Sequence, residues 1–199
     1  AGPSEVNIVA DKTSNPEWIA SDLIGQAEHD VLAQCILISK DKKILELTRK
    51  EIFKQLKLIP RSSIAKKSLM TNGILMNVSS DKKIIEIINK LGPEHLEISI
   101  KNYKPLVSKI KNAGSVCLGK YGVMAMTDYG VPGTNHVLPT NSTSKYSSGL
   151  NVSEFMKRIS FITLSKKGID KLGPSAITLA NYEGLSAHAE SIIKRIRRK

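Results

Sequence analysis

The sequence predicts an α/β protein with a Rossmann-like, mostly parallel sheet, followed by a small, mainly helical C-terminal segment. From the start of the chain to about residue 118, short apolar runs alternate with amphipathic stretches. Such alternation is typical of βα units, in which helices cover a parallel sheet. A turn-rich stretch then interrupts the pattern, and helical patterns follow it. We expect an α/β domain over residues 1–148 and the helical segment over residues 149–199.

The short apolar runs are the expected strands, and they cover residues 6–10, 34–39, 73–78, 95–100 and 115–118. The expected helices lie between them, over residues 16–29, 41–56, 81–91 and 104–112. Asn15-Pro16 offers a cap followed by proline at the first helical position, and an Asp stands at the start of each of the next two helices. Those two helices also repeat apolar residues at steps of three and four, as amphipathic helices do.

The stretch from Gly130 to Gly149 consists almost entirely of turn-forming residues. It is too long for an ordinary connection between two elements, so we expect it to be functional, a domain boundary, or both. Beyond it we expect a short strand over residues 159–164 and two helices over residues 168–183 and 185–198.

The net charge of +12 raises the alternative of a basic nucleic-acid-binding module. However, lysines are spread over most of the expected helices, and a basic cluster occurs only at residues 194–199. The few aromatic residues are not interleaved with the basic ones, as a platform for stacking bases requires. Solvated helix faces explain the charge better, so we expect no nucleic-acid partner.

We expect a cytoplasmic protein with no membrane partner. No apolar run approaches the roughly 20 residues that span a bilayer, and no secretory signal is visible at the N-terminus. Cys35 and Cys117 each lie in an apolar run, which favours buried thiols in a reducing compartment over a disulfide or a metal thiolate. The chain opens almost directly on an apolar strand and has no initiator Met, so we expect a piece of a longer protein, with an incomplete sheet.

Two of the four histidines pair with a neighbour that suggests chemistry. His29 follows Gln26 by three residues, so on a helix both can face the same object. His95 follows Glu94 at the entrance to an expected strand, where a carboxylate and an imidazole can supply two bases for two proton transfers. Taken singly, each pattern also fits a solvated helix end or a surface pair.

The other two histidines stand beside further oxygen donors. His136 lies at the far end of a Gly/Pro-rich loop that begins at Asp128, and His188 follows Glu183 by five residues at a helix start. Helix capping and surface charge are the ordinary explanations for each. Together, however, Gln, His, Asp and His offer the nitrogen and oxygen donors that suit Zn²⁺. The combination therefore favours a mononuclear zinc site.

These segments together resemble histidinol dehydrogenase. The matching strings are Ala1-Gly-Pro-Ser-Glu-Val6, Asn15-Pro-Glu-Trp18, Gln26-Ala-Glu-His-Asp30, Gly92-Pro-Glu-His-Leu-Glu97, Asn112-Ala-Gly-Ser115, Asp128-Tyr129, Thr134-Asn-His-Val-Leu-Pro-Thr140, Ser147-Ser-Gly-Leu150, Lys157-Arg-Ile-Ser160 and Glu183-Gly-Leu-Ser-Ala-His188. They fall in the family's order over essentially the whole chain, so the joint match is far more specific than any single motif.

The resemblance implies an enzyme that oxidises L-histidinol through histidinaldehyde to L-histidine, the last two steps of histidine biosynthesis, and passes two hydrides to two NAD. It implies that His95 takes the alcohol proton and that Glu94 activates the water that attacks the aldehyde. It also implies a zinc ion that orients the substrate and is redox-inert. The implied zinc ligands are Gln26, His29, Asp128 and His188.

The resemblance further implies that the substrate meets the zinc ligands, His95 and three more residues: Ser4, His136 and Glu183. It implies a homodimer whose C-terminal segment is exchanged between subunits, so that Glu183 and His188 complete the partner chain's site.

The family's enzymes are about twice as long as this chain, and the part without a counterpart here includes the domain that contacts NAD. No G-x-G-x-x-G fingerprint occurs in the chain. We therefore expect the NAD contacts upstream of Ala1 and no activity from these residues alone. A non-catalytic fragment that binds zinc or dimerises remains the alternative.

Overall fold

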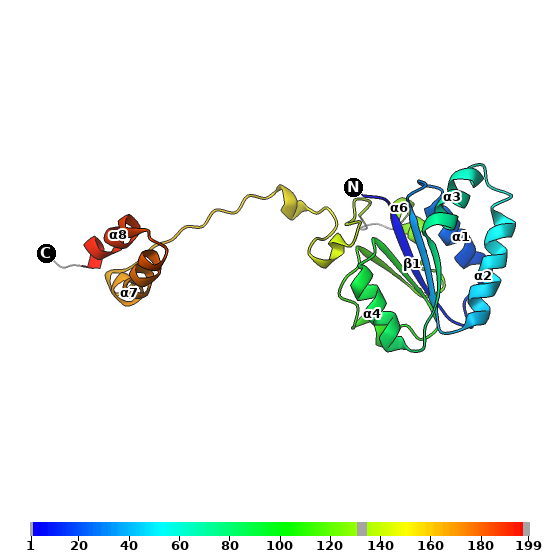
Figure 1. Cartoon of the computed structure of the whole chain (residues 1–199), viewed down its shortest axis with the longest axis horizontal. Coiled ribbons are helices and arrows are strands. Elements are labelled where there is room, and N and C mark those ends of the chain that lie inside the picture. Colours follow the sequence, from blue (N-terminus) through cyan, green and yellow to red (C-terminus); the bar gives the residue numbers. More distant parts are fainter. Residues whose placement is uncertain (1, 131–134, 197–199) are drawn as a thin grey trace. The chain divides into compact units, whose positions relative to one another are not determined.

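A computed structural model describes residues 2–130 and 135–196 of the chain. The chain forms two compact units, Ala1–Glu154 and Phe155–Lys199 (Figure 1). Residues 131–134 of the turn-rich stretch and the expected end of the last helix at residue 198 lie outside the described residues. In the part of the chain that is described, no helix is long and apolar enough to cross a membrane.

The first unit is built on a sheet of five parallel strands, which confirms the expected fold class. The strands are β1 (Glu5–Ala10), β2 (Gln34–Ser39), β3 (Gly73–Asn77), β4 (His95–Ser99) and β5 (Ser115–Leu118). Their order in the sheet is β3-β2-β1-β4-β5, and every neighbouring pair is parallel. All six residues of β1 are buried, as expected for the central strand.

Helices cover both faces of this sheet (Figure 1). On one face lie α1 (Pro16–Ala27), α2 (Lys42–Gln55) and α3 (Ser62–Asn72), which pack with Val6 and Ile8 of β1. On the other face lies α4 (Asp81–Leu91), whose Ile84 and Ile88 pack with Val9. Successive residues of a strand point to opposite faces, so β1 contributes to both cores.

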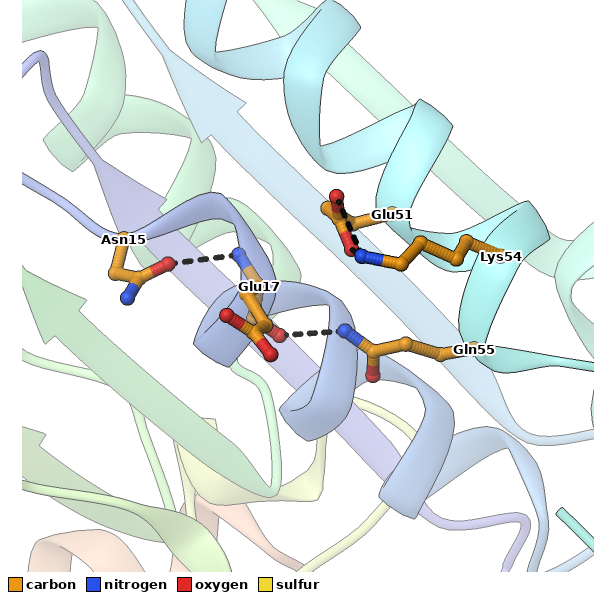
Figure 2. Close-up of polar contacts among 5 residues, drawn as sticks. All are labelled: Asn15, Glu17, Glu51, Lys54 and Gln55. Carbon is orange, nitrogen blue, oxygen red and sulfur yellow. Dashed lines mark hydrogen bonds and ion pairs between the residues drawn. The ribbon is translucent and has the colours of Figure 1, made fainter. Parts of the chain in front are cut away.

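The expected caps begin α1 and α2, whereas α4 is capped by Ser80 and the expected cap, Asp81, is its first helical residue. The Asn15 side chain accepts a hydrogen bond from the Glu17 backbone N–H at 2.9 Å, with Pro16 at the first helical position. One helix further on, the Gln55 side chain donates to the Glu17 carbonyl oxygen at 2.9 Å and so ties α2 to the first turn of α1. Figure 2 shows both bonds, together with the ion pair between Lys54 and Glu51 on α2.

Several boundaries differ from expectation. The first helix ends at Ala27, so His29 lies on the turn that follows it. The helix expected over residues 104–112 is only α5 (Lys104–Val107). Two helices occur where none was expected: α3, and α6 (Met124–Tyr129) inside the irregular stretch after residue 118. That stretch also contains the short 3₁₀ turns η1 (Thr143–Lys145) and η2 (Val152–Phe155).

In the second unit two helices, α7 (Lys166–Tyr182) and α8 (Ser186–Ile196), pack against each other. Gly173 of α7 allows the close approach, because a Cβ atom there would lie 2.4 Å from Ile196 Cδ1 of α8. The strand expected over residues 159–164 was wrong: these residues form neither helix nor strand. The run is apolar and β-branched, but it pairs with no strand among the described residues.

Candidate functional site

The candidate acid–base residues lie at the amino ends of the central strands. Ser4 immediately precedes β1, Glu94 immediately precedes β4, and His95 is the first residue of β4. The register pairs Val6 of β1 with His95, so the starts of these two strands lie side by side. Ligands of open α/β sheets usually bind at the carboxyl ends of the strands. These residues instead lie at the amino ends of the strands, a side of the sheet called here its amino edge.

The turn that leads into β4 depends on two glycines. Gly92 ends α4 in the left-handed region with φ of 58°, where a side chain is strained. Gly114, just before β5, lies so close to the preceding strand that a Cβ atom would be 2.6 Å from the Glu94 carbonyl oxygen. Both glycines thus let the chain fold tightly around Glu94.

The Glu94 carboxylate is buried and is held by β1. Its Oε2 accepts a hydrogen bond from the Ser4 hydroxyl at 2.6 Å and another from the Glu5 backbone N–H at 2.9 Å. In return, the Glu94 backbone N–H donates to Glu5 Oε2 at 3.4 Å. Burial raises the pKa of Glu5, although the N–H donors of Glu94 and Asn141 work against that shift. The structure therefore brings the predicted Ser4 and Glu94 together.

His95 is only 4% exposed, and its Nδ1 has no hydrogen-bond partner among the described residues. Burial lowers the pKa of this imidazole, because it disfavours the cation. The carboxylates of Glu94 and Asp128 oppose the shift, whereas His29 and His136 add to it. His95 is therefore a neutral base with four of the other predicted site residues within electrostatic reach.

Asp128 and His136 are also brought together. His136 Nδ1 lies 3.2 Å from Asp128 Oδ1, and the Asp128 side chain is 8% exposed whereas that of His136 is 71% exposed. Asp128 lies on α6, the helix that the sequence did not predict. The contact bridges the two ends of the Gly/Pro-rich loop.

Gln26 lies on α1 and is completely buried, yet neither its Oε1 nor its Nε2 has a hydrogen-bond partner among the described residues. A buried amide without partners costs about 1–3 kcal/mol. His29 is exposed on the turn after α1, where its carbonyl oxygen accepts a hydrogen bond from the Arg61 guanidinium at 3.3 Å. A regular helix does not connect the two residues, but both come from the end of α1 at the amino edge of the sheet.

The other two predicted residues belong to the second unit. Glu183 caps the C-terminus of α7, and His188 lies in the first turn of α8; both are exposed. Among the residues described, no group of three or more His, Cys, Asp or Glu side chains is placed to hold a metal ion. Of the four predicted zinc ligands, only His29 and Asp128 both belong to these residue types and lie in the first unit.

Sequence reasoning gave no role to three carboxyl groups beside the site, of which Glu5 and Glu97 are buried and Asp22 is partly buried. The Glu5 carboxyl group accepts a hydrogen bond from the Glu94 backbone N–H. Asp22 of α1 hydrogen-bonds to Glu97 of β4. A signal was present for two of them. Glu97 is an acid within a buried strand, and Asp22 precedes Gln26 by one helical turn.

The two cysteines are buried and free, as their apolar surroundings predicted. Burial raises the pKa of Cys35 and of Cys117 to about 12 in each case, so both remain neutral thiols. Neither is part of the cluster around His95.

Fold and site together define an α/β protein that gathers acid–base groups and a buried unpartnered amide at the amino edge of a parallel sheet. The family model of histidinol dehydrogenase matches residues 1–196 of the chain. The chain belongs to the histidinol dehydrogenase family.

Individual relatives carry the same name. The histidinol dehydrogenase of Pelagibacter ubique (strain HTCC1062) is 71% identical over 199 residues, which are 100% of this chain and 46% of that protein. That of Listeria monocytogenes (strain ATCC BAA-679 / EGD-e) is 46% identical over 96% of this chain and 45% of its own length. A crystal structure of histidinol dehydrogenase from Elizabethkingia anophelis superposes with a TM-score of 0.85 at 41% identity, covering 98% of this chain and 45% of that one. The chain thus spans just under half the length of these relatives.

Proposed function

We propose that this chain supplies the acid–base and metal-binding part of a histidinol dehydrogenase, which oxidises L-histidinol through histidinaldehyde to L-histidine. The observation that carries the proposal is the cluster at the amino edge of the sheet. There Ser4 and the Glu5 N–H hold the Glu94 carboxylate beside the buried His95 imidazole. Membership of the family supports this assignment.

The two bases suit two different proton transfers. His95 has a lowered pKa and is neutral near pH 7, so it can take the hydroxyl proton of the alcohol. Glu94 is fixed by its two donors to Oε2, and its role is to take a proton from the water that attacks the aldehyde. Ser4, His136 and Glu183 are the proposed further contacts to the substrate.

A zinc ion fits the donors that surround these bases. The Gln26 amide is buried without a partner, and a metal bound at its oxygen would remove that penalty. Asp128 and His29 add a carboxylate oxygen and an imidazole nitrogen, which are ordinary zinc ligands. His188 is the proposed fourth ligand. When bound, the zinc holds and orients the substrate's nitrogen atoms without changing its own oxidation state.

NAD is the proposed hydride acceptor, and its contacts are not assigned to this chain. The sequence lacks the G-x-G-x-x-G fingerprint of dinucleotide sites. Since the relatives are more than twice as long as the matched region, the residues that bind NAD are proposed to lie in the part of those proteins that this chain does not cover.

We further propose a homodimer in which the second unit completes the partner's site. The segment that leads into α7 presents large apolar side chains to solvent: Phe155, Met156, Ile159, Phe161, Ile162 and Leu164, which are between 55% and 90% exposed. An apolar surface of this kind favours burial by another chain. Glu183 and His188 would then act on the partner's substrate, and the buried free thiols fit a cytoplasmic location.

The division of labour between the two bases can be tested in a longer protein that contains this chain. His95→Asn keeps a polar side chain but removes the base, and we expect the alcohol step to slow by about 10²–10⁴-fold. Glu94→Gln keeps the shape but cannot accept a proton, and we expect chiefly the aldehyde step to slow. NADH formation from histidinol and from histidinaldehyde measures the two steps separately.

Each variant serves as the control for the other, with circular dichroism to verify folding and zinc content to verify the metal site. Equal losses in both steps for both variants would contradict the proposed roles. Replacing Gln26, His29 and Asp128 by Ala, one at a time, tests the proposed metal site. Unchanged zinc content in all three variants would contradict it.

A further inference from the structure

Two carboxyl groups beside the site take no part in the proposed chemistry. Asp22 of α1 and Glu97 of β4 are hydrogen-bonded to each other, and Glu97 is only 1% exposed. Two ionised carboxylates cannot be buried in contact without a large electrostatic cost. Burial raises the pKa of Glu97 to about 8 and that of Asp22 to about 6, so near neutral pH the pair keeps one proton, which forms the hydrogen bond between the two carboxyl groups.

The Glu97 carboxyl group also caps the start of a helix. Glu97 Oε1 accepts a hydrogen bond of 2.7 Å from the backbone N–H of Met124, the first residue of α6. The residue before it, Val123, provides no side-chain cap. The first N–H groups of a helix need acceptors from outside the helix, and Glu97 supplies one from the sheet. The Glu97 carboxyl group thus contacts both Asp22 of α1 and the start of α6.

Each of the three elements that meet at this pair carries a residue of the proposed site. Asp22 precedes Gln26 by four residues on α1, which places the two on one helical face. Asp128 lies on α6. On β4, His95 and Glu97 are two residues apart and so point to the same face of the sheet.

We propose that the hydrogen-bonded pair Asp22–Glu97 is a positioning device that fixes α1 and α6 against β4. It sets the spacing between the metal donors on the two helices and the base on the strand. This inference rests on the proposed function, because it is the proposed zinc and acid–base chemistry that requires a fixed spacing. Residues that hold metal ligands in position typically contribute about 10–100-fold to metal affinity.

The chemistry of the pair gives a conservative and a disruptive variant. Glu97→Gln replaces the O–H donor by an N–H donor and keeps the oxygen that accepts from Met124, so both bonds can persist. Glu97→Met has a similar volume but neither bond, and it leaves Asp22 and the Met124 N–H unpaired. Ser39→Ala is the matched control, because it removes a buried hydrogen bond of 2.8 Å, to the Ala10 carbonyl oxygen, at the opposite edge of the sheet.

Zinc affinity of the 199-residue chain is measured by competition with a chromophoric chelator, in variants shown by circular dichroism to be folded. We expect Glu97→Met to bind zinc at least about 10-fold more weakly than the unaltered chain. Glu97→Gln and Ser39→Ala should stay within a few-fold of it. If Glu97→Met binds zinc as tightly as Ser39→Ala does, the pair contributes only to stability and the inference is wrong.

A metal-free measurement separates this inference from the proposed function. If the unaltered chain binds no zinc, the proposed metal site fails, but the positioning role is still decided by amide hydrogen exchange. We expect residues 124–129 to exchange at least about 10-fold faster in Glu97→Met and at the original rate in both other variants, because these amides depend on the Glu97 cap. Unchanged exchange in Glu97→Met would overturn the inference whatever the zinc result.

Discussion

The Glu94 carboxylate is held in place by donors from the strand next to its own. The Ser4 hydroxyl and the Glu5 N–H both reach Oε2, and hydrogen bonds to an ionised acceptor are about twice as strong as neutral ones. These two bonds fix the orientation of the carboxylate. Ser4 therefore has two candidate tasks, one toward the substrate and one toward Glu94.

Ser4→Ala distinguishes these tasks in a longer protein that contains the chain. Loss of the 2.6 Å bond to Glu94 should lower kcat for histidinaldehyde by about 10-fold and leave its KM within a few-fold, because Glu94, the proposed water-activating base, is less well oriented. Steady-state kinetics with histidinaldehyde measure both constants. A raised KM with unchanged kcat would instead mean that Ser4 serves the substrate alone.

The residues at this site differ in how far the sequence could predict them. Glu94, His95, Asp128 and His136 stand in distinctive motifs, and the structure brings the other three within electrostatic reach of His95. Glu5 could not be assigned from its position, since an acid at the start of a strand is ordinarily a solvated end. Its role depends on the Glu94 peptide of a strand that is distant in sequence.

The helices and strands were predictable where the hydrophobic pattern is strong. α4 and β5 begin and end at the expected residues. α3 was missed because its buried side chains are small, Ala65 and Ser68, and Ser68 packs close enough to donate to the Ala33 carbonyl oxygen. α6 was missed because its cap comes from Glu97, a residue of the sheet rather than a local neighbour.

The close approach of β5 to the Glu94 peptide predicts a contrast between two glycines. Gly114→Ala would place a Cβ atom 2.6 Å from a backbone oxygen, so we expect a loss of about 1–3 kcal/mol in the free energy of unfolding. A Cβ atom on Gly25, within α1, would have no neighbour within 4 Å, so Gly25→Ala should stabilise the chain by about 0.5–1 kcal/mol. Urea unfolding followed by circular dichroism measures both; a harmless Gly114→Ala would refute the tight turn.

The Asp22–Glu97 pair predicts a pH dependence of stability. Burial raises the pKa of Glu97 from 4.5 to about 8 and that of Asp22 from 3.8 to about 6. The unfolded chain therefore releases these protons at lower pH than the folded one. Their contribution to stability is complete below about pH 4 and is lost as pH rises to about 8. Because each pKa unit corresponds to about 1.4 kcal/mol, the loss is of the order of a few kcal/mol.

Comparison with Glu97→Gln isolates this contribution, since the amide does not titrate. Two other groups also contribute to the pH dependence. The pKa of His95 is lowered, so this residue adds stability as pH rises toward 6.5, and the pKa of Cys117 beside the pair is raised. Subtracting the two unfolding profiles between about pH 4 and pH 9 removes what both proteins share. Parallel profiles would show that Glu97 is not protonated in the folded state.

At the scale of the whole molecule, the two units differ in how well they bury their apolar residues. The first unit encloses two cores on the two faces of its sheet. In the second unit, Gly173 and Ala189 are the only residues buried in α7 and α8, respectively, and Leu172, Leu179 and Tyr182 of α7 are 59% to 90% exposed. Such a helix pair gains stability chiefly from contacts with another surface. Residues 159–164 are likewise apolar but exposed, and this apolar run led to the wrong prediction of a strand.

For the whole molecule we predict that these 199 residues alone will not oxidise histidinol at a useful rate. A hydride acceptor must be held about 3–3.5 Å from the reacting carbon, and such positioning contributes roughly 7–11 kcal/mol to lowering the barrier. The chain covers only 46% of its Pelagibacter relative and has no dinucleotide fingerprint. We therefore expect it to retain the proposed bases and metal donors without the groups that place NAD. Purified chain is incubated with zinc, histidinol and NAD, and NADH absorbance is followed beside a longer protein that contains the same residues. Turnover of the two proteins at comparable rates would place the NAD site within residues 1–199, at a position that the sequence does not reveal.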